Sequence, residues 1–107
     1  MPQIKHVVFV RFKASTSQQK VKQLFAALDG LRHKIPGLLD FSGGPYSSGE
    51  GLNKGFTHGL VMTFADAASR DAYQPHPEHE KVKALIFPEL DGGVDGVVAF
   101  DWQHQPG

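Results

Sequence analysis

Tyr73, His76 and His79 are the side chains of this sequence whose types and spacing could do acid–base chemistry. They cluster around the prolines at 75 and 77, where a helix must break and its side chains can project into a cleft. A neutral imidazole titrates near neutrality and suits general acid–base work. A phenol can donate a hydrogen bond to a carbonyl or stabilise an enolate. These three side chains are therefore the first candidates for catalysis.

His6 and His58 are the second group of candidates, because each falls on the apolar side of a segment that alternates like a β-strand. His6 shares its side with positions 8, 10 and 12, and His58 shares its side with positions 56, 60, 62 and 64. A polar ring on such a side must find a partner or line a cavity. Because the first and third strands are neighbours in the expected sheet, one interpretation is that both rings face one pocket. The alternative is that each is a core histidine satisfied by a carbonyl or hydroxyl group.

Two further interpretations of these residues stay open. The run at 76–79, His-Pro-Glu-His, is as compatible with a capped helix start as with an active site. His6, His58 and His79 could also bind a divalent cation together with a carboxylate such as Glu78, if the fold brought them together. Because sequence spacing does not show such convergence, we assign neither a metal nor a cofactor.

The elements that must position these residues follow from the apolar pattern. We expect strands at 4–12, 38–41, 56–64 and 97–102, a helix whose apolar positions run from 21 to 31, and a broken helix from 66 to 86. An exposed glycine- and serine-rich loop is expected at 42–55, and a frayed tail at 103–107. His33, near a helix end, and His104, in the tail, stay outside the expected site.

This order of elements predicts the fold class. Strand, helix, strand, strand, helix, strand is the ferredoxin-like split βαβ arrangement, an α+β fold with a four-stranded antiparallel sheet and helices on one face. At 107 residues, we expect a single domain spanning 1–107. Its bare sheet face would carry more apolar side chains than a soluble monomer tolerates. These are Val7, Phe9, Val61, Val98 and Phe100. A homodimer formed by two such faces is the expected solution.

The composition limits the other classes of partner. Lysine plus arginine equals aspartate plus glutamate at 11 each, so no net field attracts nucleic acid or an acidic membrane. The absence of cysteine excludes disulfides and thiolate zinc sites, and favours the cytoplasm. The sequence has neither a signal-peptide pattern nor an apolar run long enough to span a membrane. Apart from a second copy, we expect only a small-molecule ligand.

Three motifs, taken together, resemble the stress-responsive dimeric α/β-barrel (Dabb) family. They are Ile4-Lys5-His6-Val7-Val8 with Arg11-Phe12-Lys13, then Gly55-Phe56-Thr57-His58 followed by Thr63-Phe64, and finally Tyr73 with His76-Pro77-Glu78-His79. The family contains plant stress proteins and a plant polyketide cyclase. The resemblance implies ferredoxin-like subunits in two-fold dimers.

The resemblance also implies roles for the four candidate residues. His79 would be the general base on an acidic C–H between two carbonyls, with Tyr73 orienting the reacting carbonyl. His6 and His58 would hold substrate oxygens. The loop before Gly55 differs from the tryptophan-containing segment of the plant proteins, so the identity of the substrate does not transfer.

Three functions remain open at the level of sequence. The first is a small-molecule cyclase, lyase or isomerase, and the second is a non-catalytic, stress-associated structural dimer. A haem- or quinone-handling monooxygenase is the third, because other dimeric α/β barrels carry out such chemistry. A ligand-sized cavity beside His79 would favour the first over the second.

Overall fold

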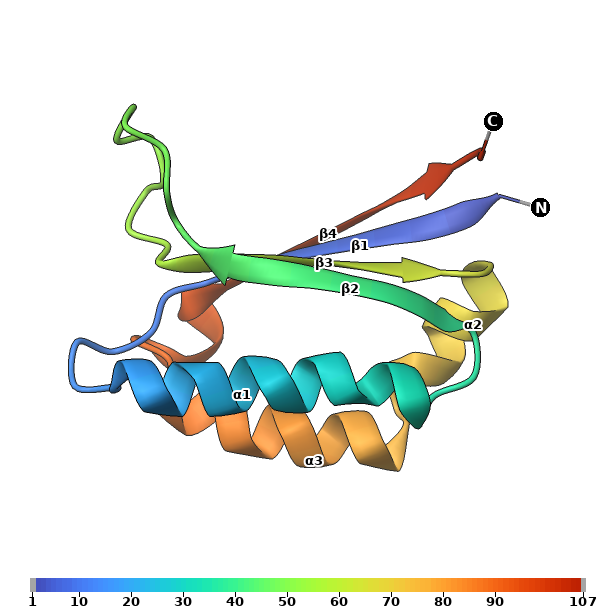
Figure 1. Ribbon diagram of the computed structural model, residues 1–107, viewed down its shortest axis with the longest axis horizontal. Coiled ribbons are helices and arrows are strands. Elements are labelled where there is room, and N and C mark those ends of the chain that lie inside the picture. Colours follow the sequence, from blue (N-terminus) through green and yellow to red (C-terminus); the bar gives the residue numbers. More distant parts are fainter. Residues whose placement is uncertain (1, 107) are drawn as a thin grey trace.

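The computed structural model describes residues 2–106 and consists of one sheet covered by helices (Figure 1). The strands are β1 (Gln3–Val10), β2 (Leu38–Pro45), β3 (His58–Phe64) and β4 (Val97–His104). The helices are α1 (Gln18–Gly30), α2 (Ala67–Tyr73) and α3 (Pro77–Ile86), with short 3-10 turns at Leu31–His33, Phe87–Glu89 and Gly93–Gly96. The sheet order is β2-β3-β1-β4, with antiparallel pairing throughout. The predicted ferredoxin-like architecture is confirmed.

The first two helices each begin at a residue whose side chain caps the first turn. The Ser17 hydroxyl accepts a hydrogen bond from the Lys20 amide at 3.0 Å, and the Asp66 carboxylate accepts one from the Ser69 amide at 2.8 Å. Each oxygen satisfies an amide that has no partner inside its helix. The two caps fix where α1 and α2 begin.

The pairing register decides which side chains face the helices. On β1, His6 lies opposite Met62 of β3 and opposite Asp101 of β4, whereas Val10 lies opposite His58. Because side chains alternate along a strand, all of these residues point to the covered face. The largest fully buried side chains lie between the sheet and the helices: Phe64, Leu24, Leu31, Met62 and Leu90.

The expectation of an exposed loop from Ser42 to Gly55 is wrong in its first part, because residues 42–45 belong to β2. Gly43 pairs with Leu60 and Pro45 pairs with His58. Since β2 is an edge strand, a proline and glycines are tolerated there. The close packing even requires Gly43, because a Cβ atom at this position would lie 2.7 Å from the Phe25 ring. The loop proper covers residues 46–57.

The other strand limits differ from expectation at their ends. The tail was expected to fray from Gln103, but Gln103 and His104 belong to β4 and pair with Ile4 and Gln3 of β1. A neighbouring strand that begins early enough to pair with them explains the difference. β1 ends at Val10, beyond which Phe12 forms a single bridge with Leu90, and β3 begins at His58.

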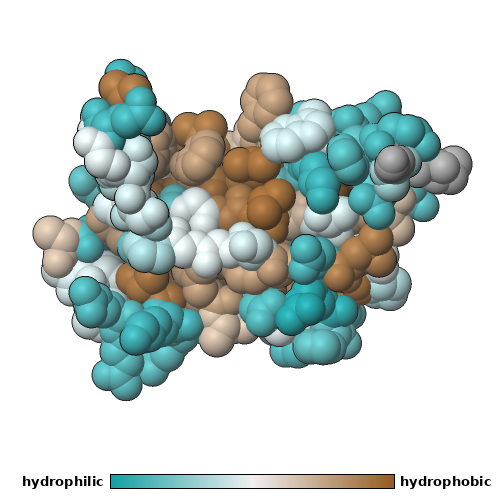
Figure 2. Space-filling view, turned by 45° about the horizontal axis from the view of Figure 1, so that its top comes forward, coloured by the Kyte–Doolittle hydropathy of each residue, from teal (hydrophilic) through white to brown (hydrophobic). Residues whose placement is uncertain are grey.

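The face of the sheet away from the helices is open and apolar. Its exposed hydrophobic side chains include Phe9, Val98 and Trp102, and Phe100 keeps 65% of its surface accessible. Figure 2, which shows this face obliquely, has hydrophobic side chains gathered over the middle of the sheet. In residues 2–106, no helix is both long and apolar enough to cross a membrane.

Candidate active site between the sheet and the helices

A cavity of about 360 Å³ lies between the sheet and the helices. This volume is within the range of small-molecule pockets, which are mostly apolar with a few polar groups. Its polar lining residues are His6, Tyr73, Gln74, His79 and Lys83. The apolar ones are Val8, Val10, Phe12, Phe25, Leu28, Leu60, Met62, Ile86, Phe87, Leu90, Val97 and Ala99. Three of the four predicted site residues therefore share one cavity.

The break between α2 and α3 brings Tyr73 and His79 together. Tyr73 is the last residue of α2, and His79 lies in the first turn of α3, which Pro77 begins. The two rings stack, with centroids 3.9 Å apart and planes 23° from parallel. The short interruption folds the chain back, so that two residues from different helices form one wall of the cavity.

The hydrogen bond at His79 sets its tautomer. Nδ1 lies 3.0 Å from the carbonyl oxygen of Gln74, so Nδ1 carries the proton of the neutral ring and donates it to that oxygen. Nε2 then keeps a lone pair. Burial lowers the pKa of His79, and this outweighs the opposing hydrogen bond to Gln74. His79 is thereby held in the neutral form that a general base requires.

Tyr73 is kept as a protonated phenol. Only 3% of the residue is exposed, and its ring contacts Phe64 at a centroid distance of 5.0 Å and His6 at 5.9 Å. Burial raises the pKa of Tyr73, and the negative charge of Asp101 raises it further. The hydroxyl is therefore a hydrogen-bond donor at neutral pH, suited to a carbonyl oxygen or an enolate.

His6 is held by an acidic partner on the neighbouring strand. Its Nδ1 lies 2.5 Å from Oδ1 of Asp101, whose Oδ2 accepts a hydrogen bond of 2.9 Å from Nη1 of Arg70. Burial opposes ionisation of Asp101, but the hydrogen bonds from His6 and Arg70 outweigh it and lower the pKa of this carboxyl group. A chain of three polar side chains thus runs from α2 through β4 to β1.

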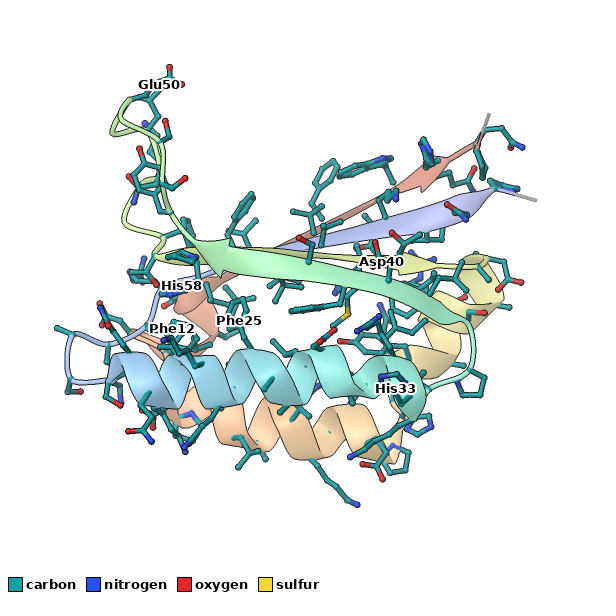
Figure 3. All side chains as sticks on the ribbon, viewed as in Figure 1. Phe12, Phe25, His33, Asp40, Glu50 and His58 are labelled. Atoms are coloured by element: carbon teal, nitrogen blue, oxygen red, sulfur yellow. The ribbon has the colours of Figure 1, made fainter. Side chains whose placement is uncertain are left out.

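His58 does not line this cavity, so the expectation of one pocket for all four residues is wrong for this ring. It lies opposite Val10 near the far end of β1, and contacts Phe12 and Phe25 at centroid distances of 5.1 and 5.6 Å. Figure 3 shows the three rings together between the sheet and the start of α1. His58 lines a separate groove, and its Nδ1 lies 2.9 Å from the Thr57 hydroxyl. Burial lowers the pKa of His58.

The remaining histidines lie outside the cavity. His76 caps α3, since its Nδ1 accepts a hydrogen bond of 3.1 Å from the Glu78 amide. The 76–79 run is therefore both a capped helix start and, through His79, part of the cavity wall. His33 and His104 are exposed, and Figure 3 places His33 at the opposite end of the molecule from His58. Within residues 2–106, no group of three or more histidine, aspartate or glutamate side chains is arranged to hold a metal ion.

Three residues of the site were not predicted from the sequence: Asp101, Arg70 and Gln74. Asp101 carried a usable signal, because a β1–β4 pairing with alternating side chains puts one residue of β4 opposite His6. Arg70 lies one helical turn before Tyr73, which could have suggested that both reach the same region. Gln74 acts through its backbone carbonyl, which side-chain patterns do not reveal.

Comparison with known proteins assigns the chain to a family. The chain is 28% identical over 100 residues to the stress-response A/B barrel domain-containing protein HS1 of Arabidopsis thaliana, covering 94% of this chain and 88% of that protein. It is 25% identical over 76 residues to olivetolic acid cyclase of Cannabis sativa, covering 71% of this chain and 75% of the cyclase.

Solved structures agree with this assignment. A dimeric ferredoxin-like protein of unknown function from Jannaschia sp. CCS1 superposes with a TM-score of 0.83 at 29% identity, covering 94% of this chain and 97% of that one. A family model described as the stress responsive A/B barrel domain matches residues 4–104. Since this match spans almost the whole sequence, the chain belongs to the stress responsive A/B barrel domain family.

Proposed function

We propose that this protein is a small-molecule cyclase or lyase that uses His79 as general base and Tyr73 as hydrogen-bond donor. The observation that supports this most is the stacked Tyr73–His79 pair on the wall of a 360 Å³ cavity, with Nδ1 of His79 bonded to Gln74 and Nε2 left with its lone pair. The similarity to olivetolic acid cyclase supports the same class of chemistry.

The proposed reaction is an intramolecular aldol closure. Nε2 of His79 takes a proton from a carbon between two carbonyls, and the electron pair of that C–H bond moves into an enolate. The Tyr73 phenol donates a hydrogen bond to the enolate oxygen. The carbon then attacks a second carbonyl of the same molecule, forming a C–C bond and breaking the C=O π bond. The resulting alkoxide takes the proton back from His79.

The lining of the cavity indicates the shape of the substrate. His6, Tyr73 and His79 gather at the end near the α2–α3 break. Val97, which pairs with the last residue of β1, and Phe12, which follows β1, lie at the other end. A linear poly-β-carbonyl head with an apolar tail matches this division. His6 would accept a hydrogen bond from an enol hydroxyl group of the substrate. His58, which lines the neighbouring groove, takes no part in the proposed step.

Native mass spectrometry with alkyl β-diketones and alkyl phenols, and product analysis with a linear alkyl poly-β-ketone, test this proposal. The parent protein is expected to bind and to cyclise a linear poly-β-ketone, His79→Ala to lose turnover by about a hundredfold or more, and Tyr73→Phe to be strongly impaired. His33→Ala is the matched control, because His33 is exposed and outside the cavity. Equal binding and turnover by the parent and His79→Ala would remove the proposed base from the site.

The protein is also proposed to be a homodimer that packs two open sheet faces together. The exposed apolar side chains on this face and the dimeric state of the similar Jannaschia protein support this. Sedimentation in dilute buffer is expected to show a dimer. Phe100→Asp should convert it to a monomer, because a buried carboxylate without a partner is costly. Leu85→Asp on α3, where Leu85 is 51% exposed, is the control. A monomeric parent protein would contradict the proposal.

A non-catalytic stress-associated dimer is the second candidate, and the family match and the relative HS1 favour it. It predicts that His79→Ala leaves every measurable property of the dimer unchanged apart from small stability effects. Protection of a heat-sensitive reporter enzyme, measured with the parent and with His79→Ala, separates the two candidates. Equal protection without any turnover of poly-β-ketones would support the structural role.

A further inference from the structure

We propose that Asp101 and Arg70 are positioning residues that fix which ring nitrogen of His6 faces the cavity. The arrangement is defined by the protein's own side chains. Only its consequence for turnover rests on the cyclase proposal.

The three side chains form a continuous chain of short contacts. Nδ1 of His6 lies 2.5 Å from one carboxylate oxygen of Asp101, and the other oxygen accepts a 2.9 Å hydrogen bond from Arg70. Their side chains are 13%, 21% and 23% exposed, so water competes weakly for these contacts. Both oxygens of Asp101 are therefore used inside the protein.

This geometry selects one tautomer of His6. An ionised carboxylate can only accept hydrogen bonds, so Nδ1 of His6 must carry a proton. The neutral ring then keeps its lone pair on Nε2, at the far side of the ring from Asp101. Because His6 lines the cavity while its Nδ1 is occupied, Nε2 is the atom left for a ligand. A carboxylate behind a histidine commonly sets both tautomer and ring orientation in this way.

Arg70 links this arrangement to the wall of the cavity that Tyr73 and His79 form. Arg70 and Tyr73 are one turn apart on α2, and the Tyr73 ring contacts His6 at a centroid distance of 5.9 Å. The same helix thus delivers the phenol and the cation that orients Asp101. A movement of α2 would displace Tyr73 together with Arg70, the cation that holds Asp101. The Arg70–Asp101 ion pair therefore fixes the position of Tyr73 relative to His6.

The alternative is an ion pair that only attaches α2 to the sheet. Both roles predict some loss of stability when Asp101 is replaced, so stability cannot distinguish them. The protonation site of the His6 ring can distinguish the two roles, because an ion pair that only attaches α2 to the sheet would not control this site. Nitrogen–proton correlation NMR of the imidazole rings in the full chain reads this directly and requires no substrate.

The parent protein is expected to show the Nδ1–H tautomer for neutral His6. Asp101→Asn should produce a mixture or the Nε2–H tautomer, because the amide is a weaker acceptor and can itself donate to Nδ1. Arg70→Gln should give an intermediate population, and Arg70→Lys should restore the parent pattern in part. If the cyclase proposal holds, Asp101→Asn also lowers kcat about tenfold or more.

Asp71→Asn is the matched control. Asp71 also bonds Arg70, at 2.8 Å, but it is 66% exposed, and the carboxylate bonded to His6 is that of Asp101. Its replacement is expected to leave the His6 tautomer unchanged. An Nε2–H tautomer in the parent protein, or an unchanged tautomer in folded Asp101→Asn, would overturn the proposal. Because these outcomes involve no turnover, failure of the cyclase proposal leaves this test intact.

Discussion

The two central strands each present one histidine to the helices, yet the two regions differ. The cavity region around His6 holds a charged partner, Asp101, a cation behind it, and the stacked pair from the α2–α3 break. The groove region around His58 holds aromatic rings and a hydroxyl group instead. The first region joins its histidine to two charged side chains, whereas the second surrounds its histidine mainly with aromatic rings.

Antiparallel register explains the difference between these regions. His6 pairs with Met62 and His58 pairs with Val10, so the rings are separated by four residues along β1, roughly 13 Å at the usual rise of a strand. Across the sheet, His6 meets Asp101 on β4, whereas His58 meets Pro45 on the edge strand β2. The same sequence signal therefore leads to two environments.

The substitution with the largest expected effect tests whether the cavity region contributes more to stability than the groove region. Tyr73→Ala should lower the free energy of unfolding by about 3 kcal/mol or more, because Tyr73 is nearly fully buried against Phe64, His6 and His79. Phe25→Ala should cost less, since Phe25 is only partly buried and borders the groove. Urea unfolding at fixed protein concentration measures both. Equal losses would show that the two regions contribute alike.

The next effect probes how tightly the groove region is packed. Gly43→Ala is expected to destabilise by about 1–3 kcal/mol, because the new methyl group would meet the Phe25 ring at 2.7 Å and the Gly59 carbonyl oxygen at 3.0 Å. Gly44→Ala is the control on the same strand, where a Cβ atom meets nothing within 4 Å. Thermal unfolding of the two variants compares them. If Gly43→Ala left the stability unchanged, the Phe25 ring would have to move aside at no cost.

The smallest effect is a pH dependence shared by both regions. Burial lowers the pKa of His58 and of His79 below the ordinary value of 6.5, so the unfolded chain binds protons more readily than the folded one. Stability should therefore fall as the pH drops below about 6.5. Carboxyl groups whose pKa is lowered change their protonation state only at more acidic pH. Urea unfolding between about pH 7 and 5 therefore measures the contribution of the histidines.

Replacing these histidines gives the corresponding control. His58→Asn and His79→Asn should each flatten the fall in stability, and the double variant should remove most of their joint contribution. A double variant with the full pH dependence of the parent would assign the effect to other groups.

Local pattern alone was enough to predict the elements that carry the candidate residues. Alternation along β1 and β3 placed His6 and His58 on the helix side, Asp66 marked the start of α2, and Pro77 fell at the start of α3. These features depend on backbone chemistry within a few residues, which a sequence contains in full. The family resemblance added the pairing of Tyr73 with His79, and the structure stacks these two rings.

Strand ends were less predictable, because a strand extends as far as its neighbour offers hydrogen bonds. Residues 42–45 read as a loop, yet they pair with β3, and Gln103 and His104 extend β4 along the start of β1. Composition describes what a segment prefers in isolation. Tertiary packing can override that preference when an edge partner and a closely packed ring, such as Phe25 over Gly43, are available.

The amino-acid sequence by itself determined the order of elements, the side of the sheet on which each histidine lies, and the capping residues of the first two helices. Tertiary structure alone decided that His6, Tyr73 and His79 share a cavity, that His58 lies apart, and that Asp101 and Arg70 stand behind His6. The physical reason is how far apart in the sequence the interacting residues lie. Face and capping depend on neighbours along the chain, whereas distances between side chains depend on strand register and helix packing across the whole domain.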